Sequence, residues 1–417
     1  MSRSNLWLPY RQAKTASEPY RVIRTAGARI FLDDGRSLID GISSWWTACH
    51  GYNHPSIATA VSAQLETMPH VMLGGLVHEQ PMRLAKRLAD LLPGDLQHVF
   101  LSESGSVSVE IAMKMAMQYW LNLGSTGRTR FLSFRHGYHG DTFAAMSVSD
   151  PQQGMHRLFG EVVGGQLIVD LPRTHSEHEE FSRTLARHRH ELAGVVLEPL
   201  VQAAGGMKFH EPEVLAEVAA AVARHDLLLI LDEIATGFGR TGSLFACEQA
   251  AITPDIITLS KALTGGTLPL AATVATRRVY EAFLSDDSDC ALMHGPTFTG
   301  NALSCAAANA SLSLFESEPR LAQVAAISTR LTEGLAPCAG LQNVIDVRVK
   351  GAIGAVQLDR VPALDAMREQ FLAEDVWVRP FGDVVYLMPP FVIDDDDLDQ
   401  LTAAVCRVVR RWSLAPT

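Results

Sequence analysis

LLLILDEIATGFGRTG (residues 227–242) and PDIITLSKALTGG (254–266) are the two stretches that decide the fold. Each contains a mainly apolar run, and strands that are apolar on both faces are typical of a parallel sheet covered by helices on both sides. A charged side chain follows each run, Asp232 in the first and Lys261 in the second. Because ligands bind at the carboxyl ends of strands in such sheets, we expect these two side chains at a binding edge.

The alternation of strand and helix extends outward from these two stretches. Apolar runs at 98–102, 130–134 and 193–198 are each joined by a loop to a helix-like segment, which predicts an α/β fold with a mostly parallel sheet. From about residue 310 the pattern changes to a helix-like segment (316–337) followed by strand-like ones. This change predicts a second, smaller α+β domain.

The length of the chain also indicates more than one domain, because 417 residues exceed what a single core usually holds. We expect an N-terminal segment (1–50) that joins the small domain, a large ligand-binding domain (51–305) and a C-terminal small domain (306–417).

Composition narrows the class of protein. The net charge of −11 disfavours a nucleic-acid partner, which would need a basic face. The six cysteines include no CxxC pair, as expected for reduced thiols in the cytoplasm. There is no apolar run long enough to cross a membrane and no apolar core of a signal peptide near the N-terminus. We therefore expect a cytoplasmic protein without a membrane partner.

The two charged residues suit a reaction on a ring cofactor. A buried carboxylate such as Asp232 must be paired; it could hold the proton of a ring nitrogen, or it could be only a cap or a structural ion pair. A lysine at a strand end, such as Lys261, could be partly desolvated and nucleophilic, which suits Schiff-base chemistry, whereas most single lysines are solvated surface charges.

Two further motifs suit the rest of such a cofactor. The turn Ser104-Gly105-Ser106 opens an apolar helix and could bind a phosphate, although such turns often only cap a helix. In HGYHGDT (136–142), Tyr138 could cover an aromatic ring. The two histidines of this motif, His136 and His139, could be read as metal ligands, but no second pair of ligands has a suitable spacing, so we expect no metal. Together the four features predict pyridoxal 5′-phosphate.

Three stretches resemble the class III pyridoxal-phosphate aminotransferases of fold type I: VVLEPLVQAAGGM (195–207) and the two quoted first. The resemblance implies a large domain with a mostly parallel seven-stranded sheet. It makes Lys261 the Schiff-base lysine and proton carrier, and Asp232 the partner of the ring nitrogen. It also implies that the cofactor is bound by Gly105, Ser106 and Tyr138, and by Pro296 and Thr297 from the neighbouring subunit. A homodimer with shared active sites is therefore expected.

Shorter stretches are similar to members of this family that act in biotin synthesis. They are DGISSWWTACHGYNHP (40–55), MHGPTFTGN (293–301) and VWVRPFG (376–382). This likeness implies that S-adenosyl-L-methionine donates an amino group to 8-amino-7-oxononanoate, giving 7,8-diaminononanoate. It implies a substrate site lined by Tyr10, Trp45, Tyr138, Lys261, Gly295 and Arg379. Arg379 would clamp the acid end of the acceptor, and Trp45 would face the sulfonium and the alkyl chain.

Several alternatives stay open at this point. Trp46 is expected in the core; Asp141 could contact the donor amine, and Arg240 is a second candidate charge near the cofactor. Leu8 replaces a histidine found in many relatives, so the N-terminal contact could differ. The donor could be lysine, or the chain could be another class III aminotransferase that uses an ω-amino acid. A non-catalytic binding protein would be expected to lack Lys261 or Asp232.

Overall fold

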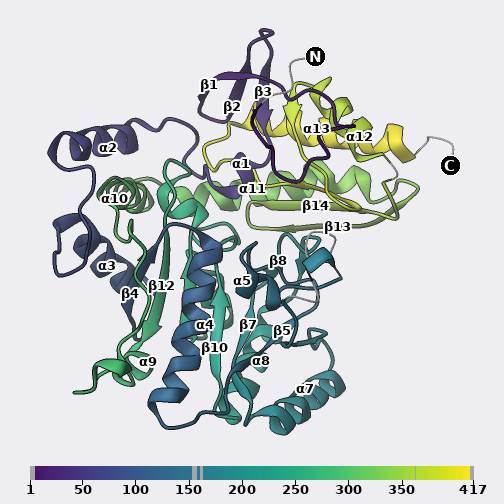
Figure 1. Cartoon of the computed structure of the whole chain (residues 1–417). Coiled ribbons are helices and arrows are strands. Elements are labelled where there is room, and N and C mark those ends of the chain that lie inside the picture. The colour runs from purple at the N-terminus through teal and green to yellow at the C-terminus, as the bar shows by residue number, and fades with distance from the viewer. Residues whose placement is uncertain (1–4, 153–156, 160–162, 362, 414–417) are drawn as a thin grey trace.

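The computed structural model describes residues 5–152, 157–159, 163–361 and 363–413. The first four residues of the expected N-terminal segment, and residue 362 and the last four of the expected C-terminal domain, therefore lie outside the described residues. Figure 1 shows a large sheet with its helices in the lower half of the molecule and smaller sheets with long helices above it.

A seven-stranded sheet organises the lower half within the described part of the chain. Strand β12 is antiparallel to its neighbours β11 and β4, and the other pairs are parallel. This confirms the predicted α/β fold with a mostly parallel sheet. The strands in spatial order are β4 (Leu96–Ser102), β12 (Ala271–Thr276), β11 (Ile256–Leu259), β10 (Leu228–Asp232), β7 (Leu192–Leu197), β5 (Arg130–Phe134) and β6 (Leu167–Val169).

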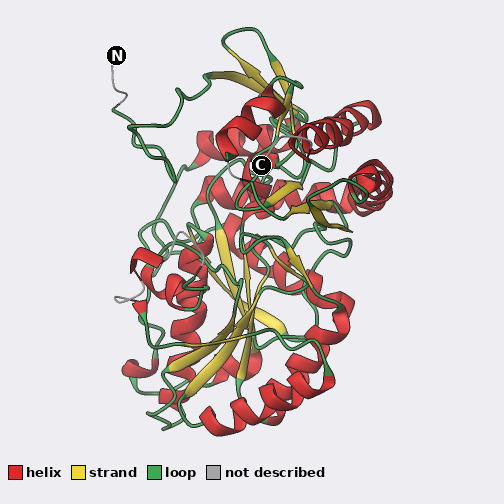
Figure 2. Cartoon of the chain, turned by 90° about the vertical axis from the view of Figure 1, so that its right-hand side faces the viewer, coloured by secondary structure: helices red, strands yellow, loops and turns green. Residues whose placement is uncertain are grey.

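Helices cover both faces of this sheet, as Figure 2 shows from the side. Leu228 and Ile230 of β10 belong to the cluster formed with helix α4 (Gly105–Asn122). Leu229 and Leu231 point to the other face, where they share a cluster with α7 (His175–His188) and α8 (Pro212–Arg224). Burial on both faces explains why the central strands are continuous apolar runs.

The upper half combines the two ends of the chain. One sheet has the order β1 (Val22–Ala26), β2 (Arg29–Leu32), β3 (Ser37–Asp40) and β15 (Val376–Trp377), so an N-terminal strand pairs with a C-terminal one. The second sheet is antiparallel, and long helices pack beside it. Its elements are β13 (Val344–Lys350), β14 (Ile353–Leu358), β16 (Val384–Leu387), α11 (Arg320–Leu335), α12 (Leu364–Leu372) and α13 (Asp395–Ser413).

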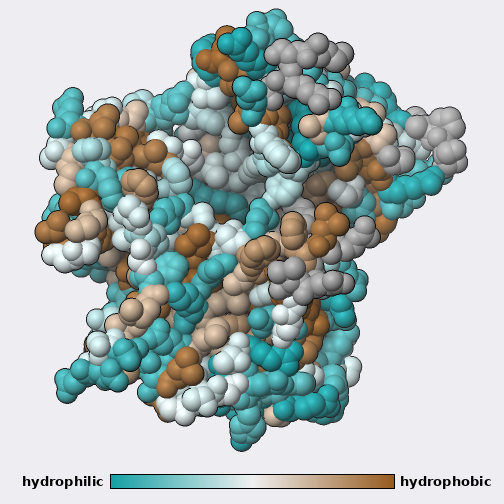
Figure 3. Space-filling view, in the orientation of Figure 1, coloured by the Kyte–Doolittle hydropathy of each residue, from teal (hydrophilic) through white to brown (hydrophobic). Residues whose placement is uncertain are grey.

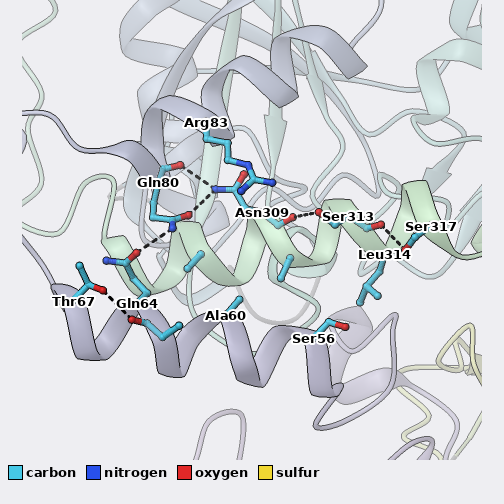
Figure 4. Close-up of a pocket in the computed structure, with 13 residues that line it drawn as sticks. Ser56, Ala60, Gln64, Thr67, Gln80, Arg83, Asn309, Ser313, Leu314 and Ser317 are labelled. Atoms are coloured by element: carbon cyan, nitrogen blue, oxygen red, sulfur yellow. Dashed lines mark hydrogen bonds between the residues drawn. The ribbon is translucent and has the colours of Figure 1, made fainter.

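Helix α10 (Ala302–Ser317) runs across residue 305, where we expect the large domain to end. It lies beside α2 (Pro55–Thr67) and close to α3 (Glu79–Leu91), as Figure 4 shows. Gln80 of α3 donates to Gln64 of α2 (Nε2 to Oε1, 3.0 Å) and accepts at Oε1 from Asn309 of α10 (3.0 Å). The division into domains stays a prediction, and these contacts favour keeping α10 with the large domain.

The remaining regular elements are short. They are α1 (Ser43–Trp46), α5 (Phe143–Ser147), α9 (Arg277–Glu281), β8 (Val201–Gln202) and β9 (Lys208–Phe209), with 3₁₀ turns η1 (Arg157–Phe159), η2 (Ala246–Ala250), η3 (Lys261–Thr264), η4 (Ser288–Cys290) and η5 (Ala336–Cys338). Among the helices of the described residues, none has the length and apolar character needed to cross a membrane.

Candidate active site

Asp232 and Lys261 lie at the carboxyl ends of two neighbouring strands, and we call them the strand-end pair. Asp232 is the last residue of β10, and Lys261 follows β11 at the start of η3. The two strands are parallel and Asp232 is paired with Thr258. The sheet therefore brings together two residues that are well separated in the sequence.

Asp232 is held as a buried, bonded carboxylate. Its side chain is only 4% exposed. His139 Nδ1 lies 2.8 Å from one oxygen, and the backbone N–H of Ile234 donates to the other (3.1 Å). Burial alone would lower the pKa of His139, but the hydrogen bond and the charge of Asp232 raise it above its usual value. His139 therefore has a role that its reading as a metal ligand did not anticipate.

Among the described residues, no group of three or more histidine, cysteine or acidic side chains could hold a metal ion.

The Lys261 amine lies against an aromatic face. Its Nζ is 4.5 Å from the centre of the Trp46 ring. Burial lowers the pKa of this amine, although the charges of Asp232 and Glu198 act in the opposite direction. A lowered pKa increases the neutral, nucleophilic fraction of a lysine. The surroundings thus favour the reactive form over a solvated surface charge.

Glu198 is a buried acid that our sequence analysis did not assign to the site. Its carboxylate accepts from the backbone N–H groups of Tyr138 (3.0 Å) and Ala203 (3.1 Å). Burial raises the pKa of Glu198 to about 7. The available signal was the acid directly after the apolar strand in VVLEP (195–199), the same pattern that singled out Asp232.

Close backbone packing joins the turn at 104–106 to the loop at 136–142. Ser106 Oγ accepts from the backbone N–H of Asp141 (3.0 Å). Gly140 has a φ of +129°, and a Cβ there would lie 2.2 Å from Ser106 Oγ. Ser104 caps α4 through Val107 N–H (3.3 Å), so the capping function is present as well. The first turn of α4 presents backbone N–H groups beside a loop with no room for a Cβ at Gly140, an arrangement suited to an anion.

Tyr138 and the N-terminal segment meet at Asp141. The Tyr10 hydroxyl donates a hydrogen bond to the Asp141 carboxylate. Burial and this bond raise the pKa of Tyr10 to about 12. Burial, together with the charges of Asp141 and Tyr10, also raises the pKa of Tyr138. Each of these phenols is held in its neutral form.

Tyr10, Trp45 and Arg379 form what we call the aromatic cluster. The rings of Tyr10 and Trp45 meet edge to face with centres 6.3 Å apart, and Arg379 lies over the Trp45 ring at 5.4 Å. Trp45 is 43% exposed, so its ring is open to a ligand. Trp46 is buried against Tyr386, which agrees with the core position expected for it, although Trp46 also contacts Lys261.

Gly295, Pro296 and Thr297 lie elsewhere in the chain's own fold. They line a cavity of about 660 Å³ together with residues of α3 and β4. The Thr297 carbonyl lies 3.0 Å from His70 Nε2. The strand-end pair does not line this cavity, so within the described part of one chain the segment is not part of the Lys261 site.

Arg240 is buried in the interior beside the last strands. Its Nη1 donates to the carbonyl of Pro389 (2.7 Å), and its guanidinium lies over Phe391 at 4.5 Å. Its other terminal nitrogen, Nη2, has no hydrogen-bond partner among the described residues. Arg240 therefore has a structural role and retains one free donor.

Comparison with known proteins places the chain in a family. The profile of class III aminotransferases matches residues 11–409. The chain belongs to the class III aminotransferase family. This confirms the resemblance inferred from the sequence motifs.

Individual relatives and solved structures are similar to this chain over nearly its whole length. An adenosylmethionine-8-amino-7-oxononanoate aminotransferase from Mycobacterium leprae is 45% identical over 97% of this chain and 95% of its own length. The crystal structure of the enzyme of the same name from Methanocaldococcus jannaschii is 33% identical with a TM-score of 0.91, covering 98% and 97% of the two chains. A PLP-bound amine transaminase from an uncultivated Pseudomonas species is 29% identical with a TM-score of 0.91, covering 98% and 99%.

The residues of this aminotransferase fit pyridoxal phosphate. The buried Asp232 carboxylate suits a protonated ring nitrogen, and the Lys261 amine suits an aldehyde. Gly140 packs tightly against Ser106, and the backbone N–H groups at the start of α4 suit a phosphate.

Proposed function

We propose that this aminotransferase transfers an amino group from S-adenosyl-L-methionine to 8-amino-7-oxononanoate, giving 7,8-diaminononanoate for biotin synthesis. The names of the relatives described above support this reaction. The observation that carries it in this chain is the aromatic cluster, because Arg379 over the exposed Trp45 ring suits a long apolar substrate with a carboxylate at its end.

In this proposal the chain uses pyridoxal phosphate as its cofactor. Bound at this site, the cofactor supplies an aldehyde that carries the amino group and a ring that stabilises negative charge. Asp232, with His139 behind it, keeps a proton on the ring nitrogen. Gly105 and Ser106 bind the phosphate, and Tyr138 covers the ring.

Lys261 acts as the proton carrier. Its Nζ takes a proton from the carbon that bears the amino group and returns it at the other end of the transfer. The lowered pKa of the amine favours the first of these steps. The Trp46 ring beside Nζ excludes water and limits the positions that the amine can reach.

The substrate contacts come from the aromatic cluster and its neighbours. Arg379 binds a substrate carboxylate through paired hydrogen bonds. Trp45 offers its face to the sulfonium of the donor or to the alkyl chain of the acceptor. Tyr10 and Asp141, already bonded to each other, lie where they can orient the substrate amine.

We also propose a homodimer in which Gly295 lines the substrate site and Pro296 and Thr297 bind the phosphate in the partner's active site. A large apolar surface around this segment supports it. Its exposed side chains are Met72, Leu76, Val77, Met82, Met293 and Phe298. Figure 3 shows hydrophobic residues gathered at the left of the molecule, where Figure 1 places α2 and α3. Exposed apolar patches of this kind mark protein interfaces.

The proposed location is the cytoplasm. All six cysteines are free thiols, which suits a reducing compartment.

Visible absorbance of the enzyme loaded with pyridoxal phosphate tests the reaction. We expect S-adenosyl-L-methionine to remove the visible band and 8-amino-7-oxononanoate to restore it. Loss of the band with lysine alone would keep the acceptor and change the donor. A response only to ω-amino acids would reject the proposed substrates and favour the alternative aminotransferase, an alternative consistent with the likeness to an amine transaminase.

A further inference from the structure

Helix α1 is a left-handed turn made without glycine. Its residues Ser43, Ser44, Trp45 and Trp46 have φ values of +49°, +47°, +57° and +74°. Ser44 and Trp45 have ψ values of 59° and 51°, close to the geometry of a left-handed helix. Residues with a Cβ rarely adopt this conformation even singly, because the Cβ crowds the next carbonyl. Four in succession need strong support from their surroundings.

Asp40 supplies much of this support. It is the last residue of β3 and is completely buried. One carboxylate oxygen accepts from the backbone N–H of Ile42 (2.9 Å), and the other accepts from the N–H of Ser44 (2.9 Å) and the hydroxyl of Tyr52 (2.6 Å). The carboxylate therefore bridges the start of the turn and a side chain that follows it.

Two further contacts close the turn. The Ser43 hydroxyl donates to the carbonyl of Met388 (2.7 Å), which anchors the turn to the end of β16. The backbone N–H of Trp46 donates to the carbonyl of Ile42 (2.8 Å). Together with the Asp40 bonds, these contacts hold the strained backbone in one conformation.

The turn presents its two indoles in different directions. Trp46 is buried, and its ring lies 4.5 Å from Lys261 Nζ. Trp45 is exposed and meets Tyr10 and Arg379. Strained backbone that is retained at a ligand site commonly has a functional reason. Here the strain allows adjacent residues to serve the lysine and the substrate cluster at the same time.

We propose that Asp40 is a positioning residue of the active site: its carboxylate holds the left-handed turn that sets Trp46 against Lys261 and Trp45 in the substrate site. Asp40 does not itself touch the substrate. The inference rests on the proposed function only in assigning Trp45 to the substrate site. It predicts that disturbing Asp40 alters substrate use through the tryptophans.

The first test is Asp40→Asn, which keeps the size of the side chain but removes one of its two strong acceptors. We expect kcat/KM for the amine donor to fall on the order of tenfold to a hundredfold, since a small misplacement of positioned groups can cost that much. The matched control is Asp34→Asn in the preceding hairpin turn, where the exposed carboxylate bonds Arg36 instead. The control should keep the wild-type value.

Near-UV circular dichroism gives a readout that needs no substrate. Asp40→Asn should change the tryptophan bands while the far-UV spectrum stays native, and Asp34→Asn should change neither. This readout keeps its meaning if the proposed substrates are wrong. In that case kcat/KM is measured with whichever amine the wild-type enzyme accepts.

A double variant separates positioning from general stability. If Asp40 acts through Trp45, the loss from Asp40→Asn should be much smaller in a Trp45→Ala background than in the wild type. Ser44→Gly should restore part of the activity of Asp40→Asn, because glycine adopts a positive φ without crowding. Losses that simply add, with no rescue by glycine, would overturn the inference.

Tyr52→Phe covers the case in which Asp40→Asn does not fold. It removes one hydroxyl that donates to Asp40 and leaves the backbone N–H donors of Ile42 and Ser44 in place. A smaller change of the same kind, in kcat/KM and in the tryptophan bands, would support the inference. Kinetics and spectra equal to those of the Asp34→Asn control would overturn it.

Discussion

Asp232 and Lys261 follow neighbouring parallel strands of one sheet, whereas Tyr10, Trp45 and Arg379 come from the N-terminal segment, the α1 turn and the loop after β15. In the strand-end pair Asp232 is buried and Lys261 is partly buried at the edge of one sheet, whereas the aromatic cluster is partly exposed and assembled from distant segments. The difference teaches that the reacting groups are positioned by neighbouring strands of one hydrogen-bonded sheet. The substrate contacts come from connecting segments outside the sheet, and such segments can vary in sequence without disturbing it.

Lys261→Ala is expected to have the largest effect, because it removes the proton carrier from the strand-end pair. We expect the rate of amino transfer to fall about a thousandfold or more, within the range for loss of a positioned acid–base group combined with a nucleophile. Stopped-flow absorbance of both half-reactions measures it. Lys86→Ala, which removes an exposed lysine paired with Asp90, is the control and should be silent. Comparable rates for the two variants would show that the reacting amine is elsewhere.

Mixed dimers test whether a third region, the segment 295–297, contributes to the active site that contains the strand-end pair of the partner. Thr297→Glu would place a negative charge beside the proposed phosphate and should lower activity about a hundredfold, as loss of a well-placed donor can. Refolding this variant together with Lys261→Ala should create a site with native Lys261 and native Thr297, and activity should return. Gel filtration confirms that dimers form. Dimers without recovered activity would contradict shared sites.

Arg379→Gln should distinguish the aromatic cluster from the strand-end pair. The paired hydrogen bonds to a carboxylate would be lost, so we expect KM for the acceptor to rise about tenfold to a hundredfold, as charge-assisted hydrogen bonds suggest. The value of kcat should change much less than in Lys261→Ala. Steady-state kinetics separates the two constants. Arg36→Gln, which loses the bond to Asp34 and the contact with the Tyr20 ring, neither of them part of the aromatic cluster, serves as control. A fall in kcat with unchanged KM would assign Arg379 to the chemical step.

Glu198→Gln should have the smallest effect, on the pH dependence of stability. Burial raises the pKa of Glu198 from 4.5 to about 7, so the folded state binds more protons than the unfolded state between these values. Stability therefore falls as pH rises through this window, by roughly 3 kcal/mol at most. The variant should show a shallower decline between pH 5 and pH 7.5 in urea unfolding.

Glu233, whose pKa burial also raises to about 7, remains in the Glu198→Gln variant and retains part of the slope. The difference between the two proteins thus isolates Glu198. An unchanged slope would mean that Glu198 does not titrate in this range.

Much of the scaffold could be predicted because its signals are local. Leu228–Leu231 is an unbroken apolar run and Ile256–Leu259 is apolar except for Thr258, and the structure buries both strands on both faces. Because β10 and β11 are parallel neighbours, their carboxyl ends bring Asp232 and Lys261 to the same edge of the sheet. The motifs around them also resemble a known family, which the comparisons confirm.

Other features depend on partners that are distant in the sequence. His139 could be read from its motif as a metal ligand, but its role follows from the position of Asp232, 93 residues later. Arg240 follows strand β10 closely in sequence, yet its guanidinium donates to the carbonyl of Pro389, far along the chain. No local pattern distinguishes such contacts from their alternatives.

The sequence by itself determined the layered α/β scaffold and the identity of the strand-end pair, because periodicity and burial act over a few residues at a time. Only the tertiary structure decided the backbone of the α1 turn. None of Ser43–Trp46 is a glycine, and their left-handed conformation persists because buried Asp40 and Met388 hold it. A conformation that is unfavourable locally can be stabilised only by the assembled fold.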